Sequence, residues 1–274
     1  MSRAAGEVFR AYDLLMRESW QRRIDRAAHL AEAGEAGRPL LVAYGRLLGL
    51  QRDCYETLRR SGERLTGSLD RDLPAVRACV APMLAAVATI GPPPVVDEAR
   101  RMLDGPALLD ATLRMGWHSG SGHQFFAKAA LQPYAQNLAD IGLRPVDRDL
   151  PPVRYGCPFC GGAPQLSILH TSGEADGGGR QLLCATCFTT WPFRRVLCAH
   201  CGEEDEHRLG YYHSPAFDHL RVDACDTCRR YLKTVDLTRL GIAVPVVDEV
   251  AGAPLDLWAV EHGYQKIELN LVGL

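Results

Sequence analysis

The chain of 274 residues has almost no excess of charge of either sign. It carries 31 Lys and Arg against 33 Asp and Glu, a formal net charge of -2. Neither half is strongly basic, and no strand-like segment alternates basic with aromatic residues. Proteins that bind nucleic acid without sequence preference usually present such a surface. The charge balance therefore argues against nucleic acid as a partner.

Long apolar runs are lacking as well. Arg3, Glu7 and Arg10 interrupt the N-terminal segment, so it has no continuous apolar stretch of the kind that a secretory signal needs. No run of about 18 apolar residues, the length of a membrane helix, occurs elsewhere. We therefore expect a cytoplasmic protein without membrane insertion. In that compartment, cysteine pairs bind metal or react more often than they form structural disulfides.

Recognisable catalytic motifs are also lacking. The segment WHSGSGHQ, residues 117–124, contains glycines and two histidines but not the spacing of a phosphate-binding loop. It is typical of a loop that connects two helices and caps the second. We predict that the protein is not an enzyme.

Helical periodicity dominates the first part of the chain. Apolar residues recur every three or four positions in residues 40–58, 76–90 and 125–141, which predicts amphipathic helices. Pro82 should kink or divide the second of these. A segment with three prolines, residues 143–153, then separates two patterns. We place a domain boundary there and predict an α-helical domain over residues 1–150.

Ten cysteines are distributed very unevenly. Cys54 and Cys79 stand alone on apolar helical faces, where we expect small buried residues. The other eight all follow the boundary and form four C-x-x-C pairs: Cys157/Cys160, Cys184/Cys187, Cys198/Cys201 and Cys225/Cys228.

An internal duplication relates these pairs. Moving the first two pairs forward by 41 residues places them on the last two, and Gly161 falls on Gly202 in the same way. Each unit therefore consists of one C-x-x-C turn, here called a knuckle, then a hairpin and a second knuckle. We predict modules over residues 151–194 and 195–239, followed by a C-terminal extension, residues 240–274, that packs on them. The fold class expected for the whole chain is α+β.

The layout of each unit is that of a zinc ribbon or a rubredoxin, in which four thiolates surround one metal ion. The predicted ligands are Cys157, Cys160, Cys184 and Cys187 for the first site and Cys198, Cys201, Cys225 and Cys228 for the second. Zinc and iron both suit four thiolates, so the metal stays open. A site closed by four sulfurs has no open position for hydrolytic chemistry.

Two other interpretations of the cysteines are less consistent with the pattern. A thioredoxin-like redox pair needs a βαβ context and does not account for four spaced copies. Cross-braced ligation, in which the first pair joins the third, conflicts with duplication of a whole unit. The five histidines of this region lack ligand spacing, and we expect them at the surface or in hairpins. Arg194, Arg195, Arg229 and Arg230 flank the inner cysteines, where they would offset the thiolate charge.

The turns of the knuckles can also be predicted. A glycine after C-x-x-C can take the left-handed conformation that completes the turn, and Gly161 and Gly202 occupy that position. The second knuckles, CATCF and CDTCR, have no such glycine. We expect them to be looser or differently turned. Each ribbon is small, so metal binding should be coupled to its folding.

The motifs together resemble those of the formate dehydrogenase accessory protein FdhE family. CPFCGG, LLCATC, WPFRRVLCAHC and DACDTCRRYLKTVD, followed by LDLWAVEHGYQKIELNLVGL, carry the resemblance. It implies a cytoplasmic maturation factor that binds the catalytic subunit of formate dehydrogenase, a molybdenum or tungsten enzyme, before export by the twin-arginine pathway. It also favours iron, with zinc the alternative, in two rubredoxin-like modules.

Two alternative functions remain open on the sequence. An electron carrier acting on the dehydrogenase cofactor would require iron, because zinc has no accessible redox couple. A zinc-ribbon protein that binds nucleic acid is the other, and the charge balance argues against it. The oligomeric state is not indicated by any motif.

Overall fold

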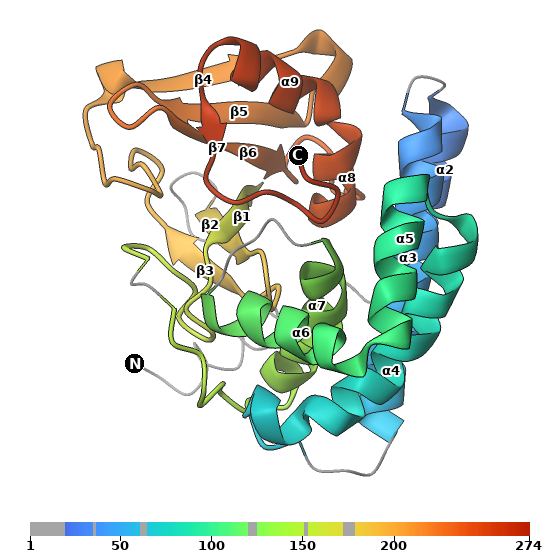
Figure 1. Cartoon of the computed structure of the whole chain (residues 1–274). Coiled ribbons are helices and arrows are strands. Elements are labelled where there is room, and N and C mark those ends of the chain that lie inside the picture. Colours follow the sequence, from blue (N-terminus) through green and yellow to red (C-terminus); the bar gives the residue numbers. More distant parts are fainter. Residues whose placement is uncertain (1–19, 35–36, 61–64, 120–124, 151–152, 172–178) are drawn as a thin grey trace.

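The computed structural model describes residues 20–34, 37–60, 65–119, 125–150, 153–171 and 179–274 (Figure 1). The first part of the described chain is helical, as the periodicity predicts. Its helices are α2 (Trp20–Ala33), α3 (Arg38–Arg60), α4 (Leu69–Ile90), α5 (Pro93–Asp104), α6 (Pro106–Ser119) and α7 (Phe125–Asp140). Residues 120–124 of the WHSGSGHQ segment lie outside the described residues, and Trp117 and His118 belong to the end of α6.

Helix α4 is one continuous helix, so Pro82 does not divide it. Val80, Met83 and Leu84, next to the proline, are all buried, so the helix packs into the core on both sides of Pro82. Leu69–Thr89 is also long and apolar enough to cross a membrane, with mean hydropathy 1.3, but half of it is buried inside the fold. The core helix of a soluble protein has the same properties, so we interpret α4 as a core helix.

Cys54 and Cys79 face each other from α3 and α4 and form a disulfide, with their Cα atoms 4.7 Å apart. The prediction that they are merely small buried residues is therefore wrong. Each does lie on a buried apolar face, as expected, but the two faces pack against each other. A pairing across two helices is not visible in the spacing of either one.

The second part of the chain forms one sheet, with strand order β3-β2-β1-β6-β5-β4 and β7 beside β6. The α+β class is confirmed. The strands are β1 (Pro164–His170), β2 (Gly179–Cys184), β3 (Thr190–Phe193), β4 (Leu209–His213), β5 (Leu220–Cys225), β6 (Arg230–Asp236) and β7 (Gln265–Lys266). Moving β2 forward by 41 residues gives β5, so the duplication extends to the strands.

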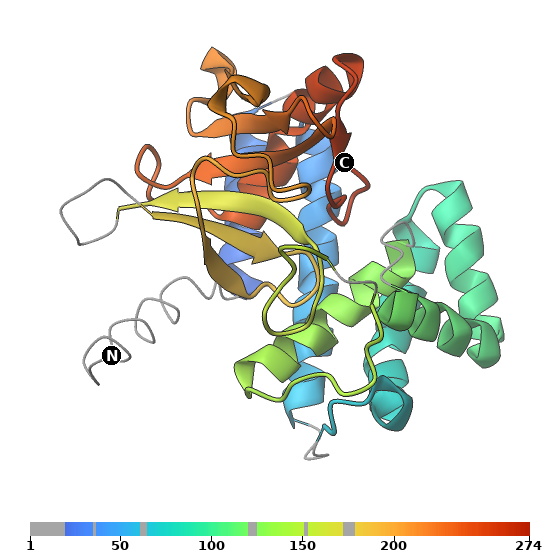
Figure 2. The same ribbon diagram turned by 90° about the vertical axis from the view of Figure 1, so that its left-hand side faces the viewer.

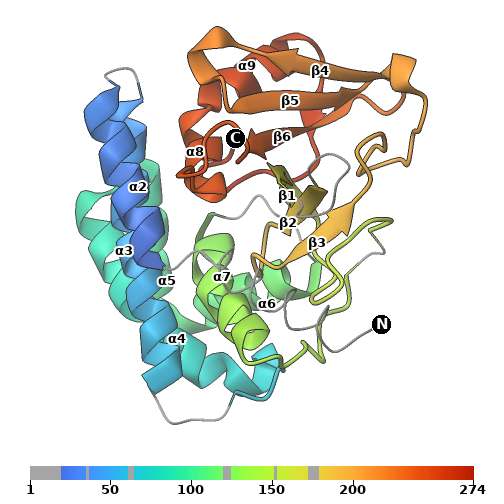
Figure 3. The same ribbon diagram turned by 180° about the vertical axis from the view of Figure 1, so that it is seen from behind.

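The two repeat units join through their outer strands. Within each unit the strands are antiparallel, whereas β1 of the first unit pairs in parallel with β6 of the second, from Leu166 beside Lys233 to Leu169 beside Asp236. The final segment adds α8 (Pro245–Ala251) and α9 (Ala253–Glu261). Figure 3 shows α8 at the end of the sheet next to α2 and α3.

A single apolar core joins the helices to the first unit. It contains residues of α3, α4 and α7 together with all four cysteines of the first unit and the valines of α8. The second unit has a separate core against α9. A hydrogen bond also joins the helices to the first unit, because Gln132 of α7 donates to the carbonyl oxygen of Ala185 at 2.9 Å. Figure 2 shows α6 and α7 below and beside the sheet.

Candidate metal centres

The structure brings the eight predicted cysteines together as two groups of four. In each group the sulfur atoms all lie within 4.8 Å of one another. The Sγ–Sγ distances are 3.6 Å for Cys157–Cys187 and 3.4 Å for Cys160–Cys184. The equivalent pairs of the second group, Cys198–Cys228 and Cys201–Cys225, are both at 3.7 Å. Each group lies within one repeat unit, unlike the cross-braced arrangement.

These distances fit a tetrahedral metal site. Four sulfurs at the usual metal–sulfur distance of about 2.3 Å from a central ion are about 3.8 Å apart. The observed separations of 3.4 Å to 3.7 Å are close to that value. The donor set therefore suits one thiophilic ion in each group, and that ion would be closed off by four sulfurs.

The knuckles share one turn geometry, including those without glycine. Gly161 and Gly202 have φ values of 73° and 80°, in the left-handed region, as predicted. Phe188 and Arg229 follow the second knuckles with φ values of 58° and 57°. The expectation that these knuckles are differently turned is therefore wrong. A non-glycine residue in this conformation costs about 1 kcal/mol or more.

Contacts of the two side chains explain why the strain is tolerated. Phe188 lies under the guanidinium of Arg23, 4.2 Å from its ring centroid, and edge-on to Trp20 of α2. Arg229 lies 3.9 Å from the ring centroid of Tyr264, and it also pairs with Asp226. Each strained residue thus ties its knuckle to a later or earlier segment of the chain.

The first cysteine group is enclosed by the main core. All four of its cysteines are buried. Gly162 packs directly on the group, since a Cβ there would lie 3.2 Å from the sulfur of Cys184. Burial raises the pKa of Cys184 and Cys187, whereas a hydrogen bond with Cys157 lowers the pKa of Cys160. A central cation would favour the thiolate form in all four.

Arg148 is a cation beside the first group that the sequence did not indicate. Its guanidinium donates to the carbonyl oxygen of Cys160 at 3.0 Å and stacks 4.8 Å from the ring centroid of Trp117. It also lowers the pKa of Cys160, after the larger hydrogen-bond effects of the other cysteines. Arg148 comes from the proline-rich segment, where no pattern relates it to a cysteine.

The second cysteine group is only partly enclosed. Cys201 and Cys228 are partly exposed, and the only other residue in its small apolar cluster among the described residues is Leu209. Burial raises the pKa of Cys225 to about 11 and also raises that of Cys228. The knuckles are linked at the surface, where Thr227 donates to the carboxylate of Glu203 at 2.6 Å.

The flanking arginines serve different contacts. Arg194 forms an exposed ion pair with Glu204, and Arg229 pairs with Asp226. The guanidinium of Arg230 lies 3.4 Å from the carbonyl oxygen of Lys266. Among the described histidines of the cysteine units, His219 in the loop before β5 is partly buried, and its Nε2 lies 2.9 Å from Asp248 of α8.

A third group of potential ligands, Asp70, His118 and Asp147, lies at the start of α4. Its carboxylates already have protein partners. Asp147 accepts hydrogen bonds from Trp117 and Ser68, and Asp70 pairs with Arg114 at 2.6 Å. We interpret it as a polar network that fixes the helix end.

Comparison with known proteins agrees with the cysteine arrangement. Residues 156–195 match the family model described as the central domain of FdhE, and residues 196–272 match that of the FdhE C-terminal domain. The two matches adjoin, so residues 156–272, which hold both cysteine units, are similar to FdhE. The resemblance noted in the sequence is confirmed.

Individual FdhE proteins extend the likeness. An FdhE homologue of Aquifex aeolicus is 34% identical over 150 residues, 55% of this chain and 52% of that protein. One of Haemophilus ducreyi is 30% identical over 118 residues, 43% of this chain and 37% of that protein. The chain thus spans about half, or less, of the length of these curated relatives.

A solved structure covers the helical part as well. The crystal structure of the FdhE protein from Pseudomonas aeruginosa superposes with a TM-score of 0.66 and 25% sequence identity. The superposition covers 93% of this chain and 95% of that one. The helical part and the two cysteine units therefore occur together in the FdhE fold.

Proposed function

We propose that this protein is an accessory factor in the maturation of formate dehydrogenase. In this role it binds the catalytic subunit in the cytoplasm before export and does not itself catalyse a reaction. The observation that carries the proposal is the FdhE-family match over both cysteine units. Four-sulfur sites with no open coordination position support a binding role over a hydrolytic one.

Each cysteine group would hold one metal ion, which gives two ions per chain. The first ion would be bound by Cys157, Cys160, Cys184 and Cys187, and the second by Cys198, Cys201, Cys225 and Cys228. Bound to four thiolates, either ion would join the ends of its unit and stabilise the fold. The ligand set accepts iron or zinc, and the family resemblance favours iron.

Binding to the catalytic subunit is tested by co-purification. The tagged chain, produced together with the catalytic subunit of a respiratory formate dehydrogenase, should retain that subunit through washing in moderate salt. The catalytic subunit of an unrelated molybdenum enzyme serves as the control and should be lost. Repeated failure to recover the dehydrogenase subunit, or equal recovery of both subunits, would contradict the proposed function.

Metal content is measured on protein purified without oxygen. We expect two ions per chain by elemental analysis, because both groups have sulfur separations suited to a tetrahedral ion. An iron-loaded protein should show visible sulfur-to-iron charge transfer when oxidised, and a zinc-loaded protein should be colourless. One ion per chain, or none, would show that a ligand set is wrong.

A further inference from the structure

The two cysteine groups have the same ligands and turns but very different surroundings. All four cysteines of the first group are buried, whereas Cys201 and Cys228 of the second are partly exposed. Because the repeat relates the two sites residue by residue, this difference comes from what each unit packs against. An ion held in the second group would therefore be more accessible to solvent than one in the first.

The enclosure of the first group comes from the helical part. Its cysteines belong to the same apolar core as α3, α4 and α7. Gly162 lies against two of the sulfurs, and Arg148 joins the carbonyl oxygen of Cys160 to the end of α6. A competing ligand could reach an ion here only if this core opened. Such openings cost a large part of the global free energy of unfolding.

No comparable cover lies over the second group in the part of the chain that the structure describes. Its small cluster contains only Leu209 besides the cysteines among the described residues. Its first knuckle is contacted by Arg154 and Tyr155, which pack on Gly202. Arg154 also donates to the carbonyl oxygen of Cys201. This contact lies on the backbone side of the knuckle. The sulfurs of Cys201 and Cys228 remain partly exposed beside it.

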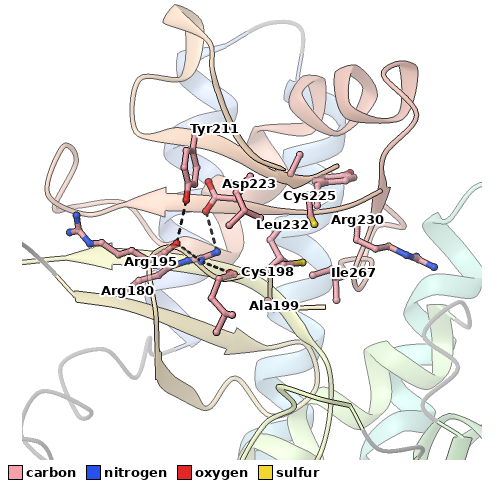
Figure 4. A pocket seen from close by; sticks show the side chains of 14 residues that line it. Arg180, Arg195, Cys198, Ala199, Tyr211, Asp223, Cys225, Arg230, Leu232 and Ile267 are labelled. Atoms are coloured by element: carbon pink, nitrogen blue, oxygen red, sulfur yellow. Dashed lines mark hydrogen bonds and ion pairs between the residues drawn. The ribbon is translucent and has the colours of Figure 1, made fainter. Parts of the chain in front are cut away.

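A small cavity with both polar and apolar lining adjoins the second group (Figure 4). It has a volume of about 20 Å³, and Cys198 and Cys225 line it together with Arg180 and Asp223. The guanidinium of Arg180 and the carboxylate of Asp223 form an ion pair at 3.2 Å. This is room for one water molecule with polar partners. The two buried cysteines of the group thus line a space that can hold water.

We propose that the second group is an exchangeable metal site for a thiophilic cation, while the first group retains its ion as part of the core. This inference rests on the proposed binding of two ions. In the exchange, an incoming ligand coordinates the ion as the metal–sulfur bonds break one after another. Each freed thiolate takes a proton from water, and the ion leaves on the new ligand without a change of oxidation state.

The experiment uses the full chain loaded with two zinc ions, the content being measured first. Excess EDTA is added, samples are treated with N-ethylmaleimide at intervals, and the labelled cysteines are located by peptide mass spectrometry. One ion should leave at least about tenfold faster than the other, since only the slower one waits for the core to open. The cysteines labelled in the fast phase should be Cys198, Cys201, Cys225 and Cys228.

Cys201→Ser provides the matched variant. It should remove the fast phase while the half-life of the slow ion stays within a factor of about two, because the groups have no cysteine in common. Parallel labelling of all eight cysteines, or earlier labelling of Cys157 and its partners, would overturn the assignment. Fewer than two ions before EDTA is added would instead contradict the proposed metal content, so the two failures are distinguishable.

Discussion

Replacing Cys157 and Cys160 by serine should remove one metal ion and most of the free energy of unfolding. Structural thiolate sites contribute on the order of 10 kcal/mol of apparent binding free energy, comparable with the whole stability of a domain. Both cysteines lie in the core that contains α3, α4 and α7. The sequence alone suggests that the helices would survive this change. The shared core leads us to expect that they lose stability as well.

The duplication supplies the control for this experiment. Cys198→Ser with Cys201→Ser makes the same change at the equivalent positions of the second unit, whose cysteines lie outside that core. Both variants should lose one ion. Only the first should lose a large fraction of its helical circular dichroism and unfold at much lower denaturant concentration. Equal losses of helical signal in the two variants would show that the first group does not support the helices.

The features that the sequence predicted depend on local spacing. Helical periodicity marks an apolar face within a few turns, and α3, α4 and α7 follow it. The C-x-x-C spacing and the 41-residue repeat together assign the cysteines to two groups, and the structure gathers them in that way. Glycine after a knuckle also predicts a left-handed turn, which Gly161 and Gly202 adopt.

The features that the sequence could not indicate depend on contacts between distant segments. The left-handed residues Phe188 and Arg229 are held by aromatic and cationic side chains from α2 and from the segment before β7. The parallel pairing of β1 with β6 joins the repeat units, and no local pattern encodes which outer strands meet. The same holds for the different burial of two sites whose motifs are nearly identical.

A buried charge network joins the C-terminal segment to the sheet. The side chain of Glu249 in α8 is completely buried, with its carboxylate 3.1 Å from the ammonium group of Lys233 on β6. It also pairs with Lys266 on β7 and accepts a hydrogen bond from Asn270 at 2.9 Å. The two lysines, after the opposing effect of burial, lower the pKa of Glu249 to about 2. The folded protein therefore favours the charged carboxylate.

Glu249→Gln should lower the free energy of unfolding by about 3 kcal/mol at neutral pH. The pKa of Glu249 is lower in the folded chain than in the unfolded chain, where it is near 4.5, so the charged carboxylate stabilises the fold at pH values above 4.5. Each unit of difference between the two pKa values corresponds to about 1.4 kcal/mol. Removing one charge from a buried group of ions costs a similar amount. The difference in free energy of unfolding between the original protein and Glu249→Gln, measured by urea unfolding, should be constant from neutral pH to about 5.

Below that pH the difference in free energy of unfolding should narrow, because Glu249 takes up a proton in the unfolded chain while the folded carboxylate stays charged. It should continue to fall toward pH 2, where the folded carboxylate takes up its proton. Protonation of the cysteine groups affects both proteins alike and cancels in the comparison. Glu204→Gln is the control, since Glu204 and Arg194 form an exposed pair, and its cost should be below about 1 kcal/mol. A Glu249→Gln cost as small as the control, or one that does not change with pH, would show that the buried charge does not stabilise this junction.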